Sequence, residues 1–373
     1  MKKIVFLTAT RADFGKLKSL IDITEKSGLF EVHIFATGMH MDTKYGKTVD
    51  EIYKHGFKNV FTYFNYYSHD PMETILSNTI IGFSHYVIDL KPDLVVIHGD
   101  RVEALAGAIV GSLNNVLTAH IEGGELSGTI DDSIRHAVTK LCHIHFAANE
   151  QAKKRLVQMG EEEESIFIIG SPDIDIMLSD KLPDLDFVKK RYEINFDKFG
   201  ILVFHPVTTE YEDIPKQAEN LVNAVVESGM NYVVVYPNND MGSEFILEEY
   251  KRFKGNPRFR LFSSIRFENF LVILKNADFI IGNSSAGIRE APYYGTPVIN
   301  IGNRQHKRSI SASILNCGYI PYEITEAINK VKKVARTKTE FDFGTGDSAQ
   351  IFLEIVKSGS IWEINKQKYF KDI

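Results

Sequence analysis

Residues 94–125 carry the sequence LVVIHGDRVEALAGAIVGSLNNVLTAHIEGGE, and its pattern recurs along most of the chain. Two short apolar runs, 94–97 and 117–121, flank a stretch at 101–113 with the pattern of a helix. A strand, a crossover helix and a second strand joined in this way form parallel neighbours in one sheet. The polar residues after each run therefore lie at the carboxyl ends of the strands, where parallel sheets bind their ligands.

The same alternation extends in both directions and predicts an α/β protein built on parallel sheets. In the first half, the expected strands are 4–7, 32–35, 60–63, 94–97, 117–121, 144–147 and 166–169, and the expected helices are 15–26, 72–90, 101–113 and 132–141. In the second half, the expected strands are 201–204, 232–235, 259–262, 279–281 and 298–301, and the expected helices are 214–227, 242–253, 266–276 and 287–294. A last helix is expected at about 350–357.

The length of the chain predicts two domains. A single hydrophobic core rarely grows beyond roughly 250–300 residues, and this chain has 373. The alternation restarts after a polar passage, which places the hinge at about 170–185. We expect an N-terminal Rossmann-like domain at 1–172, which the segment 355–373 could complete, and a C-terminal Rossmann-like domain at 185–354.

The charge balance excludes one class of partner. Lys and Arg total 43 and Asp and Glu total 49, which gives a net charge of −6. Nucleic-acid-binding domains usually carry a basic face, so no nucleic-acid partner is expected. The N-terminal apolar run is too short for a signal peptide, and no stretch approaches the roughly 18 apolar residues of a membrane span. We therefore expect a cytoplasmic protein without a membrane partner.

Several absences narrow the chemistry further. Cys142 and Cys317 are too few for a disulfide framework or a Cys-rich zinc site. Neither Gly-x-Gly-x-x-Gly nor the P-loop pattern occurs, so the dinucleotide fingerprint is missing. His143 and His145 have a spacing seen in metal sites, but they alternate with an apolar residue on a short strand and have no third ligand nearby in the sequence. We expect a structural role for both histidines and no metal site.

Carboxylates follow the two strands of the opening stretch. Asp100 and Glu122 come shortly after the two apolar runs, and Asp131 opens the next helix. An aspartate at the start of a helix is often only its cap, but capping does not account for all three positions. Carboxylates brought together raise the pKa of at least one of them, which separates acid and base roles.

Groups suited to phosphate follow other strands. Arg11 lies at the first strand-to-helix turn, where its planar fork suits phosphate oxygens, although it could instead pair with a nearby aspartate. Ser284 and Ser285 precede Gly287 in a turn that opens a helix, whose N–H groups and dipole favour an anion. A serine pair is also an ordinary N-cap. Glu290, early in that helix, is placed to accept hydrogen bonds from ribose hydroxyls.

These motifs occur as an ordered set: TRADFG at 10–15, GDR at 99–101, HIEGGE at 120–125, DDSIRH at 131–136, HP at 205–206 and GNSSAG at 282–287. The set closely resembles the UDP-N-acetylglucosamine 2-epimerase family, in particular its hydrolysing branch, which releases free N-acetylmannosamine for sialic acid synthesis. The resemblance runs from about residue 3 to about residue 310. One departure is Gly15, where the animal enzyme has a serine, so one hydroxyl contact to the nucleotide does not carry over.

The resemblance implies a GT-B fold, with two Rossmann-like domains whose parallel sheets face a central cleft that holds the nucleotide-sugar. It also implies a homodimer or homotetramer that uses neither NAD nor a metal. The residues assigned to UDP by matching positions are Arg11, Arg101, His205, Asn238, Ser284, Ser285, Glu290 and Arg304. Asp100, Glu122 and Asp131 would act near the sugar ring. Further candidates for the cleft are Asp13, His120, Arg135 and His136.

The resemblance implies a reaction as well. The C2–H of the sugar is not next to a carbonyl, so UDP must leave first or concurrently, giving an oxocarbenium-like centre that acidifies C2–H. Elimination yields 2-acetamidoglucal, and water then adds at C1 while a proton returns to C2 on the opposite face. One hypothesis assigns the C2 proton to Asp100 or Asp131 and the hydration step to Glu122.

Other functions fit part of the pattern. A non-hydrolysing epimerase would return UDP-N-acetylmannosamine. The same chemistry could act on UDP-2,4-diacetamido-2,4,6-trideoxyglucose, in the legionaminic acid pathway. A GT-B glycosyltransferase could share the phosphate-binding helix, but it needs an acceptor and does not ordinarily assemble three carboxylates in one domain. A non-catalytic sensor would bind the nucleotide-sugar without turnover.

Overall fold

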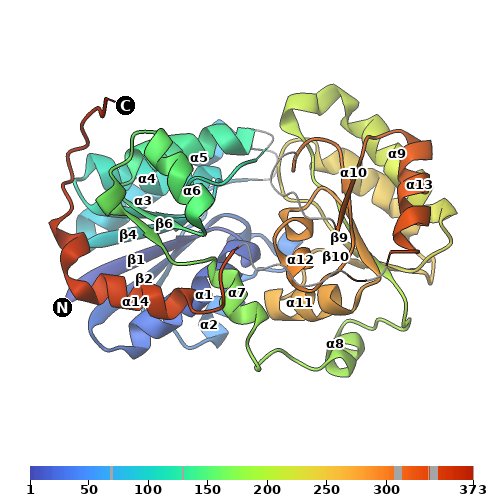
Figure 1. Cartoon of the computed structure of the whole chain (residues 1–373), viewed down its shortest axis with the longest axis horizontal. Helices are drawn as coiled ribbons and strands as arrows, with labels where there is room; N and C mark the ends of the chain where they lie inside the picture. The colour runs from blue at the N-terminus through green and yellow to red at the C-terminus, as the bar shows by residue number, and fades with distance from the viewer. Residues whose placement is uncertain (68–69, 128–129, 306–312, 335, 337–342, 373) are drawn as a thin grey trace. The chain divides into compact units, whose positions relative to one another are not determined.

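A computed structural model describes residues 1–67, 70–127, 130–305, 313–334, 336 and 343–372. The chain divides into two compact units (Figure 1). Unit 1 comprises Met1–Glu125, Asp131–Asp180 and Asp342–Ile373, and unit 2 comprises Leu126–Ile130 and Lys181–Phe341. None of the helices in the described part of the chain is long and apolar enough to cross a membrane.

Unit 1 is built on a seven-stranded parallel sheet in the order β3-β2-β1-β4-β5-β6-β7 among its described residues. Its strands are β1 (Lys2–Thr8), β2 (Phe30–Ala36), β3 (Val60–Thr62), β4 (Leu94–His98), β5 (Leu117–Ile121), β6 (Ile144–Ala147) and β7 (Ile166–Ile168). Its helices are α1 (Arg11–Lys26), α2 (Val49–Lys54), α3 (Met72–Leu90), α4 (Val102–Leu113), α5 (Ile130–Leu141), α6 (Glu150–Gln158), α7 (Pro172–Met177) and α14 (Ser348–Ser358). Short 3-10 turns are η1 (Gly38–Met41), η2 (Thr43–Tyr45), η3 (Glu163–Ser165) and η7 (Ser360–Glu363).

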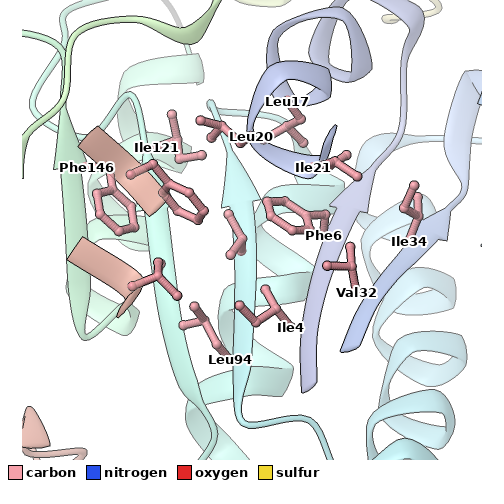
Figure 2. Packing of buried hydrophobic residues seen from close by; sticks show 14 of the residues in the cluster. Ile4, Phe6, Leu17, Leu20, Ile21, Val32, Ile34, Leu94, Ile121 and Phe146 are labelled. Carbon is pink, nitrogen blue, oxygen red and sulfur yellow. The ribbon is translucent and has the colours of Figure 1, made fainter. Parts of the chain in front are cut away.

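Alternate side chains of these strands pack on opposite faces of the sheet, as a fully covered parallel sheet requires. Ile4 and Phe6 of β1 pack with Leu17 and Leu20 of α1, and Figure 2 shows this cluster. The intervening residues of β1 point to the other face, where they pack with Phe83 of α3. Each of these buried apolar side chains contributes about 1.5–3 kcal/mol relative to exposure.

Unit 2 repeats the architecture with a six-stranded parallel sheet in the order β10-β9-β8-β11-β12-β13 among its described residues. Its strands are β8 (Gly200–Val203), β9 (Tyr232–Val235), β10 (Phe259–Phe262), β11 (Phe279–Gly282), β12 (Val298–Ile301) and β13 (Ile314–Cys317). Its helices are α8 (Leu185–Arg191), α9 (Ile214–Glu227), α10 (Ser243–Tyr250), α11 (Phe267–Asn276), α12 (Glu290–Tyr293) and α13 (Pro321–Val331), with 3-10 turns η4 (Thr208–Asp213), η5 (Lys251–Phe253) and η6 (Ser285–Gly287).

The α/β class and the two Rossmann-like parallel sheets are confirmed, and each expected strand lies within two residues of its observed bounds. The strand order reverses direction at β1 and β4 in unit 1 and at β8 and β11 in unit 2. Such a switch point is where an open α/β sheet leaves a crevice for a ligand. Several short or polar elements resemble connecting loops in the sequence and were not expected. They are α2, α6, α7, α8, α13 and β13.

The expected end of the second domain at 354 needs a correction. The helix α14 belongs to unit 1 over its whole length. Its Phe352 and Val356 are fully buried in the same cluster as Leu17, and Phe352 contacts Phe146 at a ring-centroid distance of 4.9 Å. Figure 1 shows α14 beside α1. The apolar face of α14 therefore completes the cover on one side of the unit 1 sheet.

Candidate active site

Glu122 directly follows β5 and has a left-handed backbone, with φ of +70°. A residue with a Cβ rarely adopts this conformation, and such strain gathers at functional sites. The residue is 5% exposed. In the loop after β4, a Cβ placed on Gly99 would lie 4.0 Å from Oε2 of Glu122, so the two strand ends are close. The strained turn thus directs a buried carboxylate toward the neighbouring loop.

Basic groups from three elements surround this carboxylate. Nζ of Lys16, on α1, lies 3.0 Å from Oε1 of Glu122. Nε2 of His98, at the end of β4, lies 3.2 Å from the same oxygen. Arg135, on α5, donates from Nη1 to the main-chain oxygen of Glu122 at 2.7 Å. Burying a carboxylate is costly unless it is paired. The Lys16 ammonium provides the pairing, and Nη1 of Arg135 adds a longer contact of 3.9 Å to Oε2 of Glu122.

Arg135 also joins two of the predicted carboxylates. It is 1% exposed, and its Nη2 donates to Oδ2 of Asp100. The side chain of Asp100 is 24% exposed, so this carboxylate is the more accessible of the two. Asp131 lies in the first turn of α5, four residues before Arg135 and on the same side of the helix. The structure therefore brings Asp100 and Glu122 together through one guanidinium and places Asp131 one turn away.

Three residues of this cluster, Lys16, His98 and Asp173, were not predicted from the sequence. Lys16 is 7% exposed, and its ammonium lies 3.8 Å from Oδ2 of Asp173, which is fully buried on α7. In the sequence, Asp173 lies in the polar passage at 170–185 that predicts the hinge, and no site role was predicted for it. No spacing in the sequence could have paired residues so far apart, because packing of α7 against α1 makes the contact. The available signal in the sequence was the position of Lys16 among the apolar residues of α1 that are buried, such as Phe14 and Leu17.

Arg11 and Asp13 lie at the turn between β1 and α1. Nη2 of Arg11 lies 2.9 Å from Oε1 of Glu51, on α2. Asp13 closes a capping box with Thr10 and also accepts a hydrogen bond from Oγ1 of Thr8 at 2.5 Å. Both carboxylate oxygens of Asp13, a further candidate for the cleft, therefore accept hydrogen bonds at the start of α1.

Arg101 precedes α4 and donates from Nε to Oε2 of Glu103 at 3.2 Å. Glu103 is fully buried in the first turn of that helix, so it restrains Arg101 from one side. His120, a further candidate for the cleft, lies at the end of β5. Its ring is fully buried, donates from Nε2 to the Gly99 carbonyl at 2.8 Å, and is neutral because burial lowers its pKa to about 3. His136 is exposed on α5.

In unit 2, the loops after β8 and β9 are joined through His205. Its Nδ1 accepts a hydrogen bond from the main-chain N–H of Asn238 at 3.0 Å. A neutral ring with an accepting Nδ1 carries its proton on Nε2, which is then a hydrogen-bond donor. Arg304, in the loop after β12, donates from Nη1 to the main-chain oxygen of Asn283 at 3.1 Å. The predicted nucleotide contacts of unit 2 thus come from the ends of adjacent strands.

The helix expected at 287–294 needs a correction. The chain instead forms η6 (Ser285–Gly287) and then the single turn α12 (Glu290–Tyr293). Pro292 has no N–H to continue a helical ladder, and this limits the element. Ser284 caps η6 by accepting from the main-chain N–H of Ala286 at 3.3 Å. Glu290, which is 3% exposed, begins α12.

His143 and His145 make hydrogen bonds within unit 1. His143 accepts from the main-chain N–H of Thr118 at 3.1 Å and donates to the carbonyl of Lys366 at 3.0 Å. His145 lies 2.9 Å from Oε2 of Glu161. Within the described ranges, no group of three or more His, Cys, Asp or Glu residues is arranged to hold a metal ion.

A family model of UDP-N-acetylglucosamine 2-epimerases matches residues 22–357. A UDP-N-acetylglucosamine 2-epimerase of Neisseria meningitidis serogroup B is 47% identical, covering 100% of both chains. The UDP-N,N'-diacetylbacillosamine 2-epimerase (hydrolyzing) of Legionella pneumophila is 33% identical over 96% of each chain. Among solved structures, the Methanocaldococcus jannaschii UDP-GlcNAc 2-epimerase in complex with UDP-GlcNAc and UDP has a TM-score of 0.83 at 22% identity, covering 96% of this chain and 100% of that one. That structural likeness concerns the fold.

Proposed function

Because the chain belongs to the UDP-N-acetylglucosamine 2-epimerase family, we propose that it is the hydrolysing type, which converts UDP-N-acetylglucosamine and water into N-acetylmannosamine and UDP. The product would supply sialic acid synthesis. The observation that carries the proposal is the cluster of Asp100 with the buried residues Glu122, Lys16 and Arg135 at the carboxyl ends of the unit 1 strands. Such a cluster offers proton acceptors and donors in fixed positions without a cofactor.

The proposed reaction has two stages. In the first, the C1–O bond breaks with its electron pair leaving on UDP, and a carboxylate takes the C2 proton, giving 2-acetamidoglucal. In the second, water adds its oxygen to C1 and a proton returns to C2 on the opposite face. Each general acid or base contributes on the order of 10²–10⁴-fold to the rate.

The carboxylates have distinct settings that suit these stages. Asp100 is the more exposed of the two carboxylates and pairs with the Arg135 guanidinium, and this exposure suits direct contact with the sugar. Glu122 is held by Lys16 and lies beside His98, which could supply or remove the protons of an attacking water. We assign the C2 proton to Asp100 or Asp131 and the hydration step to Glu122.

The nucleotide is assigned to a second set of residues. UDP departure is favoured by donors and positive charge directed at the diphosphate. We assign that role to Arg11, Arg101, His205, Asn238, Ser284, Ser285, Gly287 and Arg304, and we assign the ribose hydroxyls to Glu290. The ring of His205 supports this assignment. Because its Nδ1 accepts from the main-chain N–H of Asn238, a neutral ring carries its proton on Nε2, and Nε2–H is a hydrogen-bond donor.

The decisive experiment is incubation with UDP-N-acetylglucosamine in deuterated water, followed by proton NMR. The expected result is free N-acetylmannosamine with deuterium at C2, together with UDP. Recovery of an intact UDP-N-acetylmannosamine would instead identify a non-hydrolysing epimerase. UDP release with an unepimerised sugar, or only in the presence of an acceptor, would favour a glycosyltransferase.

A second candidate substrate is UDP-2,4-diacetamido-2,4,6-trideoxyglucose. It is favoured by the 33% identity to the Legionella protein, whose name specifies a diacetylated nucleotide-sugar. The chemistry at C1 and C2 would be the same, so the two substrates differ only in what surrounds C4 and C6 of the sugar. Comparing kcat/KM on both nucleotide-sugars separates them. We expect the higher value for UDP-N-acetylglucosamine, because the Neisseria relative is 47% identical.

A further inference from the structure

We propose that Asn283 is a positioning residue that fixes the nucleotide-binding loops of unit 2 relative to one another, a role that rests on the proposed function. Asn283 directly follows β11 and is fully buried. Asn283 belongs to the GNSSAG motif at 282–287, but it is not among the site residues predicted from the sequence. An amide side chain is costly to bury unless its donor and acceptor are both used.

The side chain of Asn283 uses both, on a single residue of the neighbouring loop. Its Oδ1 accepts from the main-chain N–H of His205 at 2.7 Å, and its Nδ2 donates to the main-chain oxygen of His205 at 2.8 Å. The strands β8 and β11 are the neighbours at which the strand order of this sheet reverses. Asn283 therefore joins the two loops on either side of the switch point, where a ligand crevice is expected.

The main-chain oxygen of Asn283 holds a third loop. It accepts from Nη1 of Arg304 and from Nε2 of Gln305, each at 3.1 Å. Both donors belong to the loop after β12, so one residue connects the ends of β8, β11 and β12. The loop after β9 joins the same frame, because the ring of His205 accepts from the N–H of Asn238. Three proposed UDP contacts thus depend on Asn283 directly or through one further bond.

Asparagine is the side chain that this geometry requires. Aspartate has two acceptor oxygens and no donor when ionised, so it would oppose the carbonyl of His205. Alanine would leave a buried N–H and a buried C=O of His205 without these partners. A neutral amide also adds no negative charge beside the proposed diphosphate. The inference therefore predicts that loss of this amide displaces His205 and weakens nucleotide binding more than it slows the chemistry.

The test compares Asn283→Ala and Asn283→Asp with the matched variant Asn269→Ala. Asn269 lies on α11 in the same unit, is 5% exposed, and donates from Nδ2 to the hydroxyl of Tyr192 at 3.1 Å. The Kd for UDP is measured by calorimetric titration, and KM and kcat are measured by steady-state kinetics. Both measurements are made below the melting temperature of each variant. We expect the Kd for UDP and the KM to rise on the order of tenfold or more in both Asn283 variants, with kcat changed by less than about threefold. Asn269→Ala should keep the wild-type Kd.

Acidification provides a rescue that a merely structural role would not show. The buried carboxyl of Asn283→Asp, facing a carbonyl oxygen, should have a raised pKa. Once protonated, it again offers one acceptor and one donor to His205. The ratio of its Kd for UDP to that of the wild type should therefore fall between about pH 8 and about pH 5.5, whereas the ratio for Asn283→Ala should stay constant.

A readout without ligand separates this inference from the proposed function. Nitrogen NMR of the His205 ring, assigned with His205→Gln, should show an accepting Nδ1 and a protonated Nε2 in the wild type, and loss of that pattern in Asn283→Ala. If the wild type does not bind UDP, the proposed function is overturned while the ring signals still decide the positioning role. Unchanged ring signals together with unchanged UDP affinity in both Asn283 variants would overturn the inference, even if the melting temperature falls.

Discussion

At the carboxyl ends of its strands, unit 1 holds charged side chains against one another, whereas unit 2 connects its loops through a neutral amide and main-chain atoms. In unit 1, Arg135 bridges Asp100 and Glu122, and Lys16 lies between Glu122 and Asp173. In unit 2, the side chain of Asn283 bonds to the backbone of His205. The two sheets share a fold and differ in the chemistry of the same edge.

The difference follows from what a buried charge demands. A buried carboxylate persists only with cationic or hydrogen-bonding partners, so a site for proton transfer must be built as a balanced cluster. A site for a diphosphate needs donors in fixed positions, and a neutral frame supplies these without competing charge. We therefore propose proton chemistry at the unit 1 cluster, and nucleotide binding by the unit 2 loops together with Arg11 and Arg101 of unit 1. The predictions below test this comparison.

The largest effect is expected at Glu122. Glu122→Gln keeps the shape of the side chain but removes its capacity to accept a proton, so kcat should fall by on the order of 10²–10⁴-fold. The Kd for UDP, measured by calorimetric titration, should change by less than about threefold. Asp100→Asn and Asp131→Asn should behave alike, with Asp132→Asn, at the next position of the same helix, as the control. Near-full rates in all three acidic variants would contradict the assignment.

A smaller effect is expected at Asp173. Asp173→Asn removes one of the two carboxylates near the Lys16 ammonium, which shifts the balance of charge on Glu122. We expect kcat to fall about tenfold, equivalent to about 1.4 kcal/mol. The control is Asp175→Asn on the same helix. Asp175 accepts from the main-chain N–H groups of Ser348 and Ala349, so its loss should lower the melting temperature and leave kcat unchanged. Equal effects of both substitutions on kcat would contradict a role for Asp173 in the cluster.

Acid should destabilise unit 1. Burial lowers the pKa of His40 and His143 to about 4 and that of His120 to about 3. The unfolded chain, with histidine pKa values near 6.5, binds more protons than the folded one below that pH, so stability is lost as pH falls from about 6.5 toward about 4. At pH 5 the loss is about 2 kcal/mol per histidine.

This acid effect can be measured with the chain's single tryptophan, Trp362, which lies in unit 1. Its fluorescence melting curve at about pH 5 should shift to lower temperature relative to pH 7. Replacing His143 by Asn removes one titrating group and should reduce the shift. A Trp362 transition that is independent of pH over this range would show that the three histidines are not held neutral by burial.

The smallest effect is expected at Glu210, where unit 2 does use a carboxylate. Its two oxygens accept from Nδ2 of Asn303 at 2.5 Å and from Nε2 of Gln217 at 2.7 Å. This contact supports the loop after β12 from its more exposed side, where such bonds contribute about 1 kcal/mol or less. Glu210→Gln should therefore raise the Kd for UDP by only about two- to fivefold. If Glu210→Gln raised the Kd for UDP as much as Asn283→Ala, the bonds made by Asn283 would not be the main support of the loop after β12.

Much of the site could be predicted from the sequence because strand ends carry it. The apolar runs predicted β4 and β5. Because parallel strands end at the same edge of a sheet, Asp100 and Glu122, which follow these strands, were expected to share that edge. Lys16 and Asp173 could not be found in this way, because their separation of more than 150 residues is closed only by helix packing. The edge strand β13 was missed for a different reason: its four residues include the polar Asn316, which pairs with Asn300.

The sequence by itself determined the two parallel sheets, the strand ends that carry polar residues and the resemblance to one family, since local periodicity and motif order are properties of the chain. The tertiary structure decided which polar groups share a charge or a hydrogen bond. It placed Arg135 between the carboxylates of Asp100 and Glu122, buried the ring of His120 against the Gly99 carbonyl, and joined Asn283 to His205. These contacts depend on burial and on distances of about 3 Å between atoms, which residue spacing does not encode.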